Sequence, residues 1–338
     1  MTNRRDLYIE NSLISAYKGD NLLKDVYIEH NSLPEISFDD INTFVEIFGK
    51  KVAFPLIINA MTGGTEKGCE INEMLYMLSK ELNIPMEVGS QMELIKDNDL
   101  EQLFIGEKAE GKNRKSVLIS NLSSKSSVED VKYAMDVIDA DGIALHLNSG
   151  QEAAAKDGNK DFRGIVENIK IMAEEFSDRL IVKEVGFGMS SKTIKTLVDC
   201  GVKMIDVSGA GGTNFIEIEN LRCYEYDFSD LYCWGIPTAK AIIDARNISK
   251  DIKIIASGGI KTALDIVKAI VLGADYVGIS GEILKFILHG GYDQAKQYIE
   301  ELMYKTKIIM FLLGVKNIEE LKKVNYTIKG ELKDLING

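Results

Sequence analysis

Eight short runs of apolar and β-branched residues recur along the chain, and segments with helical periodicity lie between them. Most runs are apolar at consecutive positions, which is typical of strands covered on both faces in a parallel sheet. Strands and helices that alternate in this way form parallel sheets with right-handed crossovers, so the pattern predicts an α/β fold. The runs are residues 52–60, 84–90, 117–122, 142–148, 180–186, 204–209, 253–259 and 276–281.

The helical segments carry their own start and stop signals. Thr262 and Asp265 follow the seventh strand with the spacing of a capping box, apolar residues follow at helical spacing, and Gly273 ends the helix. The helix after the fifth strand has the same arrangement, with Ser190 or Ser191 as its cap. Eight such units predict closure into a (β/α)8 TIM barrel, and an open doubly wound sheet is the alternative.

The remaining length predicts extensions to this barrel. The chain has 338 residues, whereas a barrel of this type needs about 250. We expect a single barrel domain over 1–338, with an N-terminal extension at 1–50 and a C-terminal helical extension at 292–338. Residues 210–235 are predicted to form a long loop, whose aromatic content favours a functional role over simple disorder.

Composition and charge limit the class of protein and its partners. Hydrophobic residues make up 45% of the chain and charged residues 27%, which suits a large core. The net charge of -12, without a long basic run, argues against nucleic acid or an anionic membrane surface as a partner. The four cysteines lack metal-type spacing and fit reduced thiols in a cytoplasm. No signal peptide and no membrane span are expected, because no sufficiently long apolar stretch occurs.

The densest cluster of polar residues follows the fourth strand, and chemistry in a barrel takes place at the carboxyl ends of its strands. His146 and Asn148 share one face of the strand and can together hold a diphosphate. Glu152 offers the oxygen ligand that Mg²⁺ prefers. The alternative is that His146 is a core histidine and Glu152 opens a helix. Four polar groups within seven residues, Gln151 among them, favour a functional site.

Lys183 lies inside an apolar strand, where an unpaired ammonium group is costly. Its neighbour Glu184 points to the opposite face, so an ion pair between the two is not expected. We expect Lys183 to point into the barrel mouth, where a cation stabilises an electron-rich ring such as a reduced flavin. The alternative is a structural ion pair with another carboxylate.

Glycine turns follow the last two strands. The seventh strand ends at Gly258 and Gly259, and the eighth ends at Ser280 and Gly281. In barrels, turns at these two places form a phosphate site from backbone N–H groups and a helix N-terminus. No G-x-G-x-x-G motif follows a strand and opens a helix, so a Rossmann dinucleotide site is not predicted.

Several motifs occur together and span nearly the whole chain. They are NAMTGG at 59–64, GSQ at 89–91, HLNSGQE at 146–152, KEVGFGMS at 183–190, DVSGAGGTNF at 206–215, WGIPTA at 234–239 and ASGGI at 256–260. Together with the opening Asn3-Arg4-Arg5-Asp6, they resemble the signatures of type 2 isopentenyl-diphosphate delta-isomerases, in the order of that family.

This resemblance implies an enzyme of isoprenoid biosynthesis that interconverts isopentenyl and dimethylallyl diphosphate. The family uses reduced FMN as acid and base and also Mg²⁺, with NAD(P)H as the reductant and no net oxidation. That division of labour is usual, because the cofactor carries the hard chemistry and the protein positions it. The family also suggests a homo-oligomer.

The resemblance assigns roles to individual residues. The FMN contacts it implies are Ala60, Met61, Thr62, Ser90, Asn121, Lys183, Ser208 and Thr213, with Gly258, Gly259, Ser280 and Gly281 at its phosphate. The implied substrate contacts are Arg4, Arg5, Ser90, His146, Asn148 and Gln151. Glu152 would bind the metal, and Gln151 and Lys183 are the predicted catalytic residues.

Two departures from the family pattern remove potential diphosphate contacts. Tyr8 stands where the family usually has a histidine, and Gln91-Met92 stands where many members have a basic residue. For Arg4 and Arg5 the alternative is a solvated N-terminus.

Two other functions stay open at this point. One is an FMN-dependent oxidoreductase on the same barrel, such as a 2-hydroxy-acid oxidase or a relative of inosine-monophosphate dehydrogenase. Cys223 or Cys233 could serve the second of these as a nucleophile. The other is a non-catalytic protein that binds flavin or a phosphorylated ligand.

Overall fold

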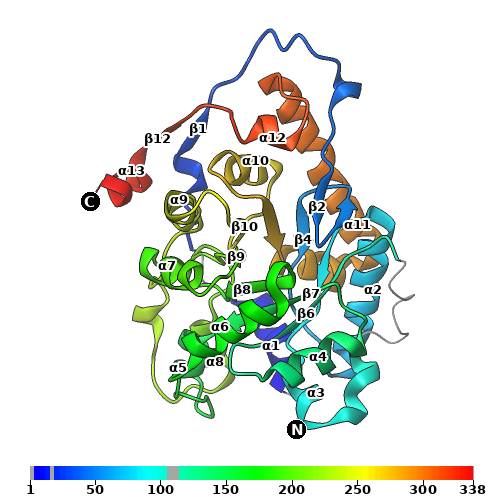
Figure 1. Ribbon diagram of the computed structural model, residues 1–338, viewed down its shortest axis with the longest axis vertical. Coiled ribbons are helices and arrows are strands. Elements are labelled where there is room, and N and C mark those ends of the chain that lie inside the picture. Colours follow the sequence, from blue (N-terminus) through cyan, green and yellow to red (C-terminus); the bar gives the residue numbers. More distant parts are fainter. Residues whose placement is uncertain (1–3, 16–18, 105–113, 338) are drawn as a thin grey trace.

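Eight parallel strands close into a barrel in chain order, with β11 hydrogen-bonded to β4 (Figure 1). The computed structural model describes residues 4–15, 19–104 and 114–337. The barrel strands are β4 (Leu56–Ile58), β5 (Met86–Glu87), β6 (Leu118–Ser123), β7 (Gly142–Leu147), β8 (Leu180–Glu184), β9 (Met204–Asp206), β10 (Lys253–Ser257) and β11 (Tyr276–Ile279). This closure confirms the predicted TIM barrel and excludes the open sheet.

Helices surround the barrel and begin where the sequence predicts caps. The Thr262 side chain accepts from Asp265 N, and Asp265 completes the capping box, while Ser190 caps the helix after β8. Each such cap stabilises its helix by about 1 kcal/mol. The helices between and after the strands are α2 (Glu66–Leu82), α3 (Met92–Lys96), η3 (Asn98–Leu103), α4 (Val128–Val137), α5 (Ser149–Ala154), α6 (Ile165–Phe176), η4 (Ser177–Arg179), α7 (Ser191–Asp199), α8 (Phe215–Arg222), η5 (Ser229–Leu231), α9 (Thr238–Ile248), α10 (Ala263–Val271) and α11 (Gly281–Leu313).

The first predicted strand is interrupted at Pro55, because proline has no N–H to donate to a strand ladder. The chain forms β3 (Lys50–Val52) before this point and β4 after it. β3 pairs with β2 (Val45–Ile47) in an antiparallel hairpin. The hairpin's Ile47 and Val52 are buried against the barrel interior, and each contributes about 1.5–3 kcal/mol by burial. The hairpin therefore closes the amino-terminal end of the barrel.

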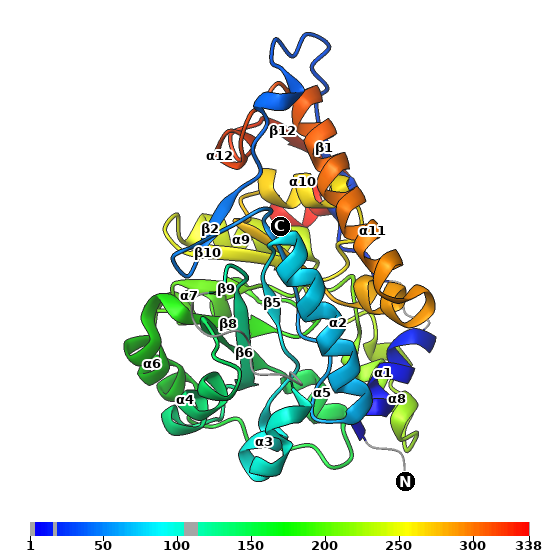
Figure 2. The same ribbon diagram turned by 90° about the vertical axis from the view of Figure 1, so that its right-hand side faces the viewer.

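The two extensions meet outside the barrel. β1 (Val26–Ile28) pairs antiparallel with β12 (Tyr326–Ile328). α11 bends at Gly291, where φ is 70°, and Figure 2 shows it running alongside α2 toward the N-terminal extension. The other elements of the extensions are α1 (Arg4–Ile14), η1 (Leu23–Asp25), η2 (Phe38–Asp40), α12 (Ile318–Leu321) and α13 (Gly330–Asn337).

The segment 210–235 is not the simple loop that the sequence predicts, because it contains α8 and η5. Asn214 caps α8 by accepting hydrogen bonds from the backbone N–H groups of Ile216 and Glu217. α8 packs against both α1 and α5, so it joins the N-terminal helix to the carboxyl end of the barrel. No helix in the described part of the chain is both long and apolar enough to cross a membrane.

Candidate active site

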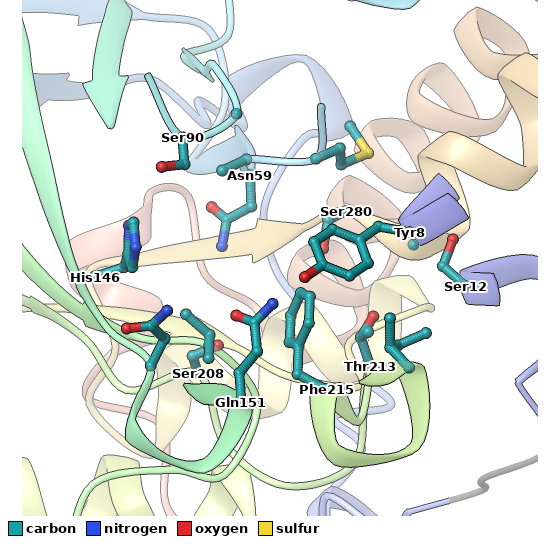
Figure 3. Close-up of a pocket in the computed structure, with 18 of the residues that line it drawn as sticks. Tyr8, Ser12, Asn59, Ser90, His146, Gln151, Ser208, Thr213, Phe215 and Ser280 are labelled. Carbon is teal, nitrogen blue, oxygen red and sulfur yellow. The ribbon is translucent and has the colours of Figure 1, made fainter. Parts of the chain in front are cut away.

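A cavity of about 1170 Å³ opens at the carboxyl ends of the barrel strands (Figure 3). Drug-sized ligands occupy pockets of roughly 300–1,000 Å³, so this cavity has room for a cofactor and a second small molecule. Apart from Arg4 and Arg5, whose side chains lie outside the described residues, every predicted site residue lines it: Ala60, Met61, Thr62, Ser90, Asn121, His146, Asn148, Gln151, Glu152, Lys183, Ser208, Thr213, Gly258, Gly259, Ser280 and Gly281.

Lys183 forms the centre of the cavity floor and is almost fully buried. Its ammonium nitrogen lies 3.6 Å from Oδ2 of Asp206 on the neighbouring strand β9. Asp206 also accepts hydrogen bonds from Asn59 Nδ2 at 3.0 Å and Ser257 Oγ at 2.6 Å. Glu184 does not share this network, because its carboxylate accepts from the backbone N–H groups of residues 185–188. The sequence offered two alternatives for Lys183, a position in the barrel mouth or a structural ion pair. Both hold, because Lys183 lines the cavity and is also ion-paired.

Glu87 of β5 is a second buried carboxyl group beside Lys183, behind the residues that line the cavity. Its Oε2 lies 4.0 Å from the Lys183 ammonium nitrogen and accepts from Ala60 N at 3.3 Å. Its Oε1 accepts from Asn121 Nδ2. Burial raises the pKa of Glu87, and the nearby Lys183 ammonium opposes that rise. The ammonium group of Lys183, which lines the cavity, therefore has two buried carboxyl groups beside it.

His146 continues this network on β7. Its Nδ1 lies 2.9 Å from Asn121 Oδ1. Because Asn121 donates its N–H to Glu87, its oxygen acts as acceptor, and we assign the histidine proton to Nδ1. Burial, with Lys183 nearby, lowers the pKa of His146 to about 3, so the imidazole is neutral and its Nε2 is an acceptor. A donor role toward a diphosphate then requires proton uptake at Nε2 when the ligand binds.

The sequence analysis did not assign a role to four residues of the network around Lys183: Asn59, Glu87, Asp206 and Ser257. The signal for the two acids was present, because each is a charged residue inside an apolar strand, as Lys183 is. An unpaired charge there is costly, so one buried cation implies buried anions near it. The identity of these acids depends on how the barrel closes. β5 and β8 are not neighbouring strands, so Glu87 and Lys183 meet only across the barrel interior.

Gln151 lies on the rim of the cavity, in α5. Its Nε2 donates to Glu219 Oε1 at 3.2 Å, and the Tyr8 hydroxyl donates to the same oxygen at 2.5 Å. Figure 3 shows Gln151 and Tyr8 pointing toward one another. Arg222 Nε donates to the other oxygen, Oε2, at 2.7 Å. Glu219, which the sequence did not single out, therefore orients Gln151 and links it to the N-terminal helix.

Glu152 lies next to this group and already has two partners. Its Oε1 accepts from Asn148 Nδ2 at 3.1 Å, and its Oε2 accepts from Asn159 N at 2.5 Å. No cluster of three or more His, Cys, Asp or Glu side chains suited to a metal occurs among the described residues. A metal at Glu152 would thus take most of its ligands from water and from a bound phosphate, as Mg²⁺ commonly does.

The opposite end of the cavity is built from backbone. Gly258 and Gly259 have φ values of 100° and 76°, and a Cβ at Gly258 would meet the Gly209 carbonyl oxygen at 2.0 Å. Only glycine fits this turn. Ser280 is the N-cap residue of α11 and its side chain makes no capping hydrogen bond, so the first turn of this helix has no side-chain cap. The two turns and this helix N-terminus line the cavity together, at the place where the sequence predicts a phosphate site.

The closed barrel and a family match together place the chain in the FMN-dependent class of barrel enzymes. The family model described as FMN-dependent dehydrogenase matches residues 111–327. Among solved structures, a mandelate oxidase variant with (S)-mandelic acid aligns with a TM-score of 0.67 at 15% identity, covering 98% of this chain and 95% of that one. A flavocytochrome b2 variant aligns with a TM-score of 0.67 at 16% identity, covering 100% and 88%. At such identities these structures show the shared fold alone.

Curated relatives narrow the class further. An isopentenyl-diphosphate delta-isomerase of Geobacillus sp. (strain WCH70) is 39% identical, covering 97% of this chain and 93% of the relative. Enzymes of the same name from Bacillus licheniformis and Ignicoccus hospitalis are 40% and 36% identical, covering 97% and 90% of this chain and 93% and 87% of the relatives. The chain belongs to the isopentenyl-diphosphate delta-isomerase family, which confirms the resemblance found in the sequence.

Proposed function

We propose that this isomerase interconverts isopentenyl and dimethylallyl diphosphate, with reduced FMN lying across the barrel mouth and Mg²⁺ at the diphosphate. One observation carries the proposal: a single cavity is lined by glycine turns with a helix N-terminus, by a buried ammonium group and by an amide held by a carboxylate. The first two suit a flavin with its phosphate tail, and the third suits a second, smaller molecule beside it.

The described residues fit FMN. Gly258 and Gly259 line the cavity, and a Cβ at Gly258 would meet the Gly209 carbonyl oxygen at 2.0 Å, so bare backbone borders the cavity at this turn, as a phosphate tail requires. FMN would be held at its ring by Ala60, Met61, Thr62, Ser90, Asn121, Lys183, Ser208 and Thr213, and at its phosphate by Gly258, Gly259, Ser280 and Gly281. When bound and reduced by NAD(P)H, it supplies acid–base chemistry at the alkene.

The protein's own groups prepare this chemistry. Lys183 keeps a positive charge beneath the electron-rich ring, because Glu87 and Asp206 raise its pKa against the effect of burial. Gln151 holds its amide on the rim, where it orients the carbon end of the substrate and assists proton movement there. Glu219 holds that amide in place through the 3.2 Å hydrogen bond.

The diphosphate needs cations that are not already neutralised. Four of the five lysines that line the cavity have a carboxylate partner: Lys96, Lys183, Lys261 and Lys285. Lys125 forms no salt bridge with the described residues, although its charge acts on Asp161; its ammonium nitrogen donates to Asn159 O at 3.1 Å and lies 3.8 Å from the centre of the Phe162 ring. We assign Lys125 to the diphosphate, together with Asn148, His146, Arg4 and Arg5, and Glu152 to its Mg²⁺.

The residues that the two rival oxidoreductase functions require are not found among the described residues of the cavity wall. A 2-hydroxy-acid oxidase needs a histidine base beside an arginine late in the barrel. Among the described residues the cavity wall contains no arginine, and His146 is its only histidine. A dehydrogenase of the inosine type needs a cysteine nucleophile, but neither Cys223 nor Cys233 lines the cavity.

The test is an assay of the purified protein with FMN, Mg²⁺ and a reductant. We expect isopentenyl diphosphate to be converted to dimethylallyl diphosphate without net consumption of the reductant. Oxidation of lactate or a nucleotide, with isopentenyl diphosphate left unchanged, would instead establish an oxidoreductase. Bound FMN without any turnover would leave only the non-catalytic binder.

A further inference from the structure

The Glu87 carboxyl group does not itself line the cavity, yet it lies directly behind residues that do. It is only 4% exposed. It contacts three residues assigned to the flavin ring: Ala60 through its backbone N–H, Asn121 through its side-chain amide, and Lys183 through its ammonium group. A substitution of Glu87 therefore alters the surroundings of three residues that are assigned to the flavin ring.

Glu87 and Asp206 differ in how closely each carboxyl group pairs with the Lys183 ammonium. Asp206 lies closer to Lys183, at 3.6 Å against 4.0 Å, and accepts hydrogen bonds from Asn59, Ser257 and the backbone N–H of Ser208. Asp206 is therefore the closer and more extensively hydrogen-bonded partner of the ammonium group. Among the described residues Glu87 accepts from two donors, Ala60 N and Asn121 Nδ2, and is the second carboxyl group beside Lys183.

We infer that Glu87 is a positioning residue that fixes Lys183 and Asn121 beneath the flavin and, when ionised, offsets the Lys183 charge and makes the flavin harder to reduce. Each buried charge matters here because the low local dielectric strengthens its interaction with a charged ring. The inference rests on the proposed FMN site and deepens it.

Among the described residues, Lys183 on β8 and Asp206 on β9 act on the Glu87 charge, and His146 on β7 is linked to Glu87 through Asn121. The two carboxylates raise the pKa of Lys183 against the effect of burial, so it stays charged at neutral pH. His146 stays neutral, since its pKa is lowered to about 3. Burial raises the pKa of Glu87. Glu87 therefore gains a proton at a higher pH than an ordinary glutamate does. Lys183 stays protonated and His146 stays neutral as this happens.

The test is the midpoint potential of bound FMN in the wild type and in Glu87→Gln, measured across a pH series. Above the pKa of Glu87, we expect the variant to favour the reduced flavin about tenfold more than the wild type does, or about 30 mV for a two-electron couple. As the pH falls, the difference should vanish, because a protonated glutamate is neutral, as glutamine is. Identical potentials at every pH, with FMN bound in both proteins, would overturn the inference.

Two further variants complete the test. Glu93→Gln removes a partly exposed acid of the cavity rim, paired with Lys96 at 2.9 Å, and should leave the potential unchanged because solvent screens that charge. Glu87→Met is a second neutral replacement and should reproduce the upward shift if Glu87→Gln does not fold. A wild type that binds no FMN refutes the proposed function itself, whereas bound FMN with no shift refutes only the role of Glu87.

Discussion

Gln151 and Glu219 are joined by a hydrogen bond of 3.2 Å, from the amide nitrogen of one to a carboxylate oxygen of the other that is almost fully buried. The same oxygen accepts from the Tyr8 hydroxyl. A rim amide from α5, a carboxylate from α8 and a hydroxyl from α1 thus form one unit. The orientation of Gln151 therefore depends on two helices that lie outside the barrel wall.

Replacing Gln151 by Asn withdraws the amide from the substrate by about one methylene. General acid–base and orienting groups typically contribute 10²–10⁴-fold, so we expect kcat to fall by about 10² or more. FMN content should be retained, because Gln151 is not assigned to the flavin. The measurement is steady-state isomerisation alongside the flavin absorbance, and unchanged turnover would remove Gln151 from the mechanism.

Replacing Tyr8 by Phe tests the second hydrogen bond to the Glu219 oxygen that orients Gln151. It removes one donor from Glu219 but leaves those from Gln151 and Arg222. A hydrogen bond of this type is worth about 0.5–1.5 kcal/mol, so we expect a fall in kcat of about two- to tenfold with unchanged FMN affinity. A loss as large as that in Gln151→Asn would show instead that Tyr8 acts on the substrate itself.

Replacing Lys183 by Ala leaves Glu87 and Asp206 without their cation. Breaking a buried ion pair from one side costs about 3–5 kcal/mol, so the free energy of unfolding should fall. We also expect weaker FMN binding or a lower midpoint potential, the opposite sign to Glu87→Gln. Titration with FMN and a potentiometric measurement check this, and the role of Lys183 is lost if affinity and potential both stay as in the wild type.

His146 should not titrate near neutral pH in the ligand-free protein. Burial lowers its pKa to about 3, so its imidazole stays neutral from about pH 5 to about pH 8. The chain has three histidines, and His146→Asn identifies the ring resonances of this one by NMR. A bound diphosphate should raise its pKa. A titration of the His146 signal within that range without ligand would contradict the assigned network.

Replacing Lys125 by Met removes the one cavity lysine that forms no salt bridge with the described residues. A single charged contact to a diphosphate is worth about 1.5–3 kcal/mol, so KM for the substrate should rise about tenfold or more. FMN affinity should not change. Lys96→Met is the matched control, because Lys96 is already paired with Glu93, and equal effects of the two variants would contradict the assignment.

The barrel was predictable because its signals are local. Each strand is a short apolar run, and caps such as Thr262 with Asp265 depend on residues three apart. The interruption at Pro55 follows from the missing N–H of proline and was readable as well. The glycine turns were found because Gly258 and Gly259 need positive φ at a known place in the barrel.

The missed features depend on contacts between distant parts of the chain. α8 was not predicted because its buried residues include Glu217, Glu219 and Asn220, so the apolar stripe that marks a surface helix is absent. Two donors to those acids lie about two hundred residues away: Tyr8 of α1 donates to Glu219, and Ser15, just after α1, donates to Glu217. Glu87 and Lys183 likewise meet only once the barrel has closed.

Deuterium uptake into isopentenyl diphosphate in heavy water distinguishes the proposed chemistry from every alternative considered. With bound FMN reduced and Mg²⁺ present, we expect deuterium in both the substrate and the dimethylallyl product by NMR, and almost none with Gln151→Asn. If the flavin-loaded wild type leaves isopentenyl diphosphate free of deuterium, or incorporates it equally well with oxidised flavin, the proposed role of this cavity is wrong.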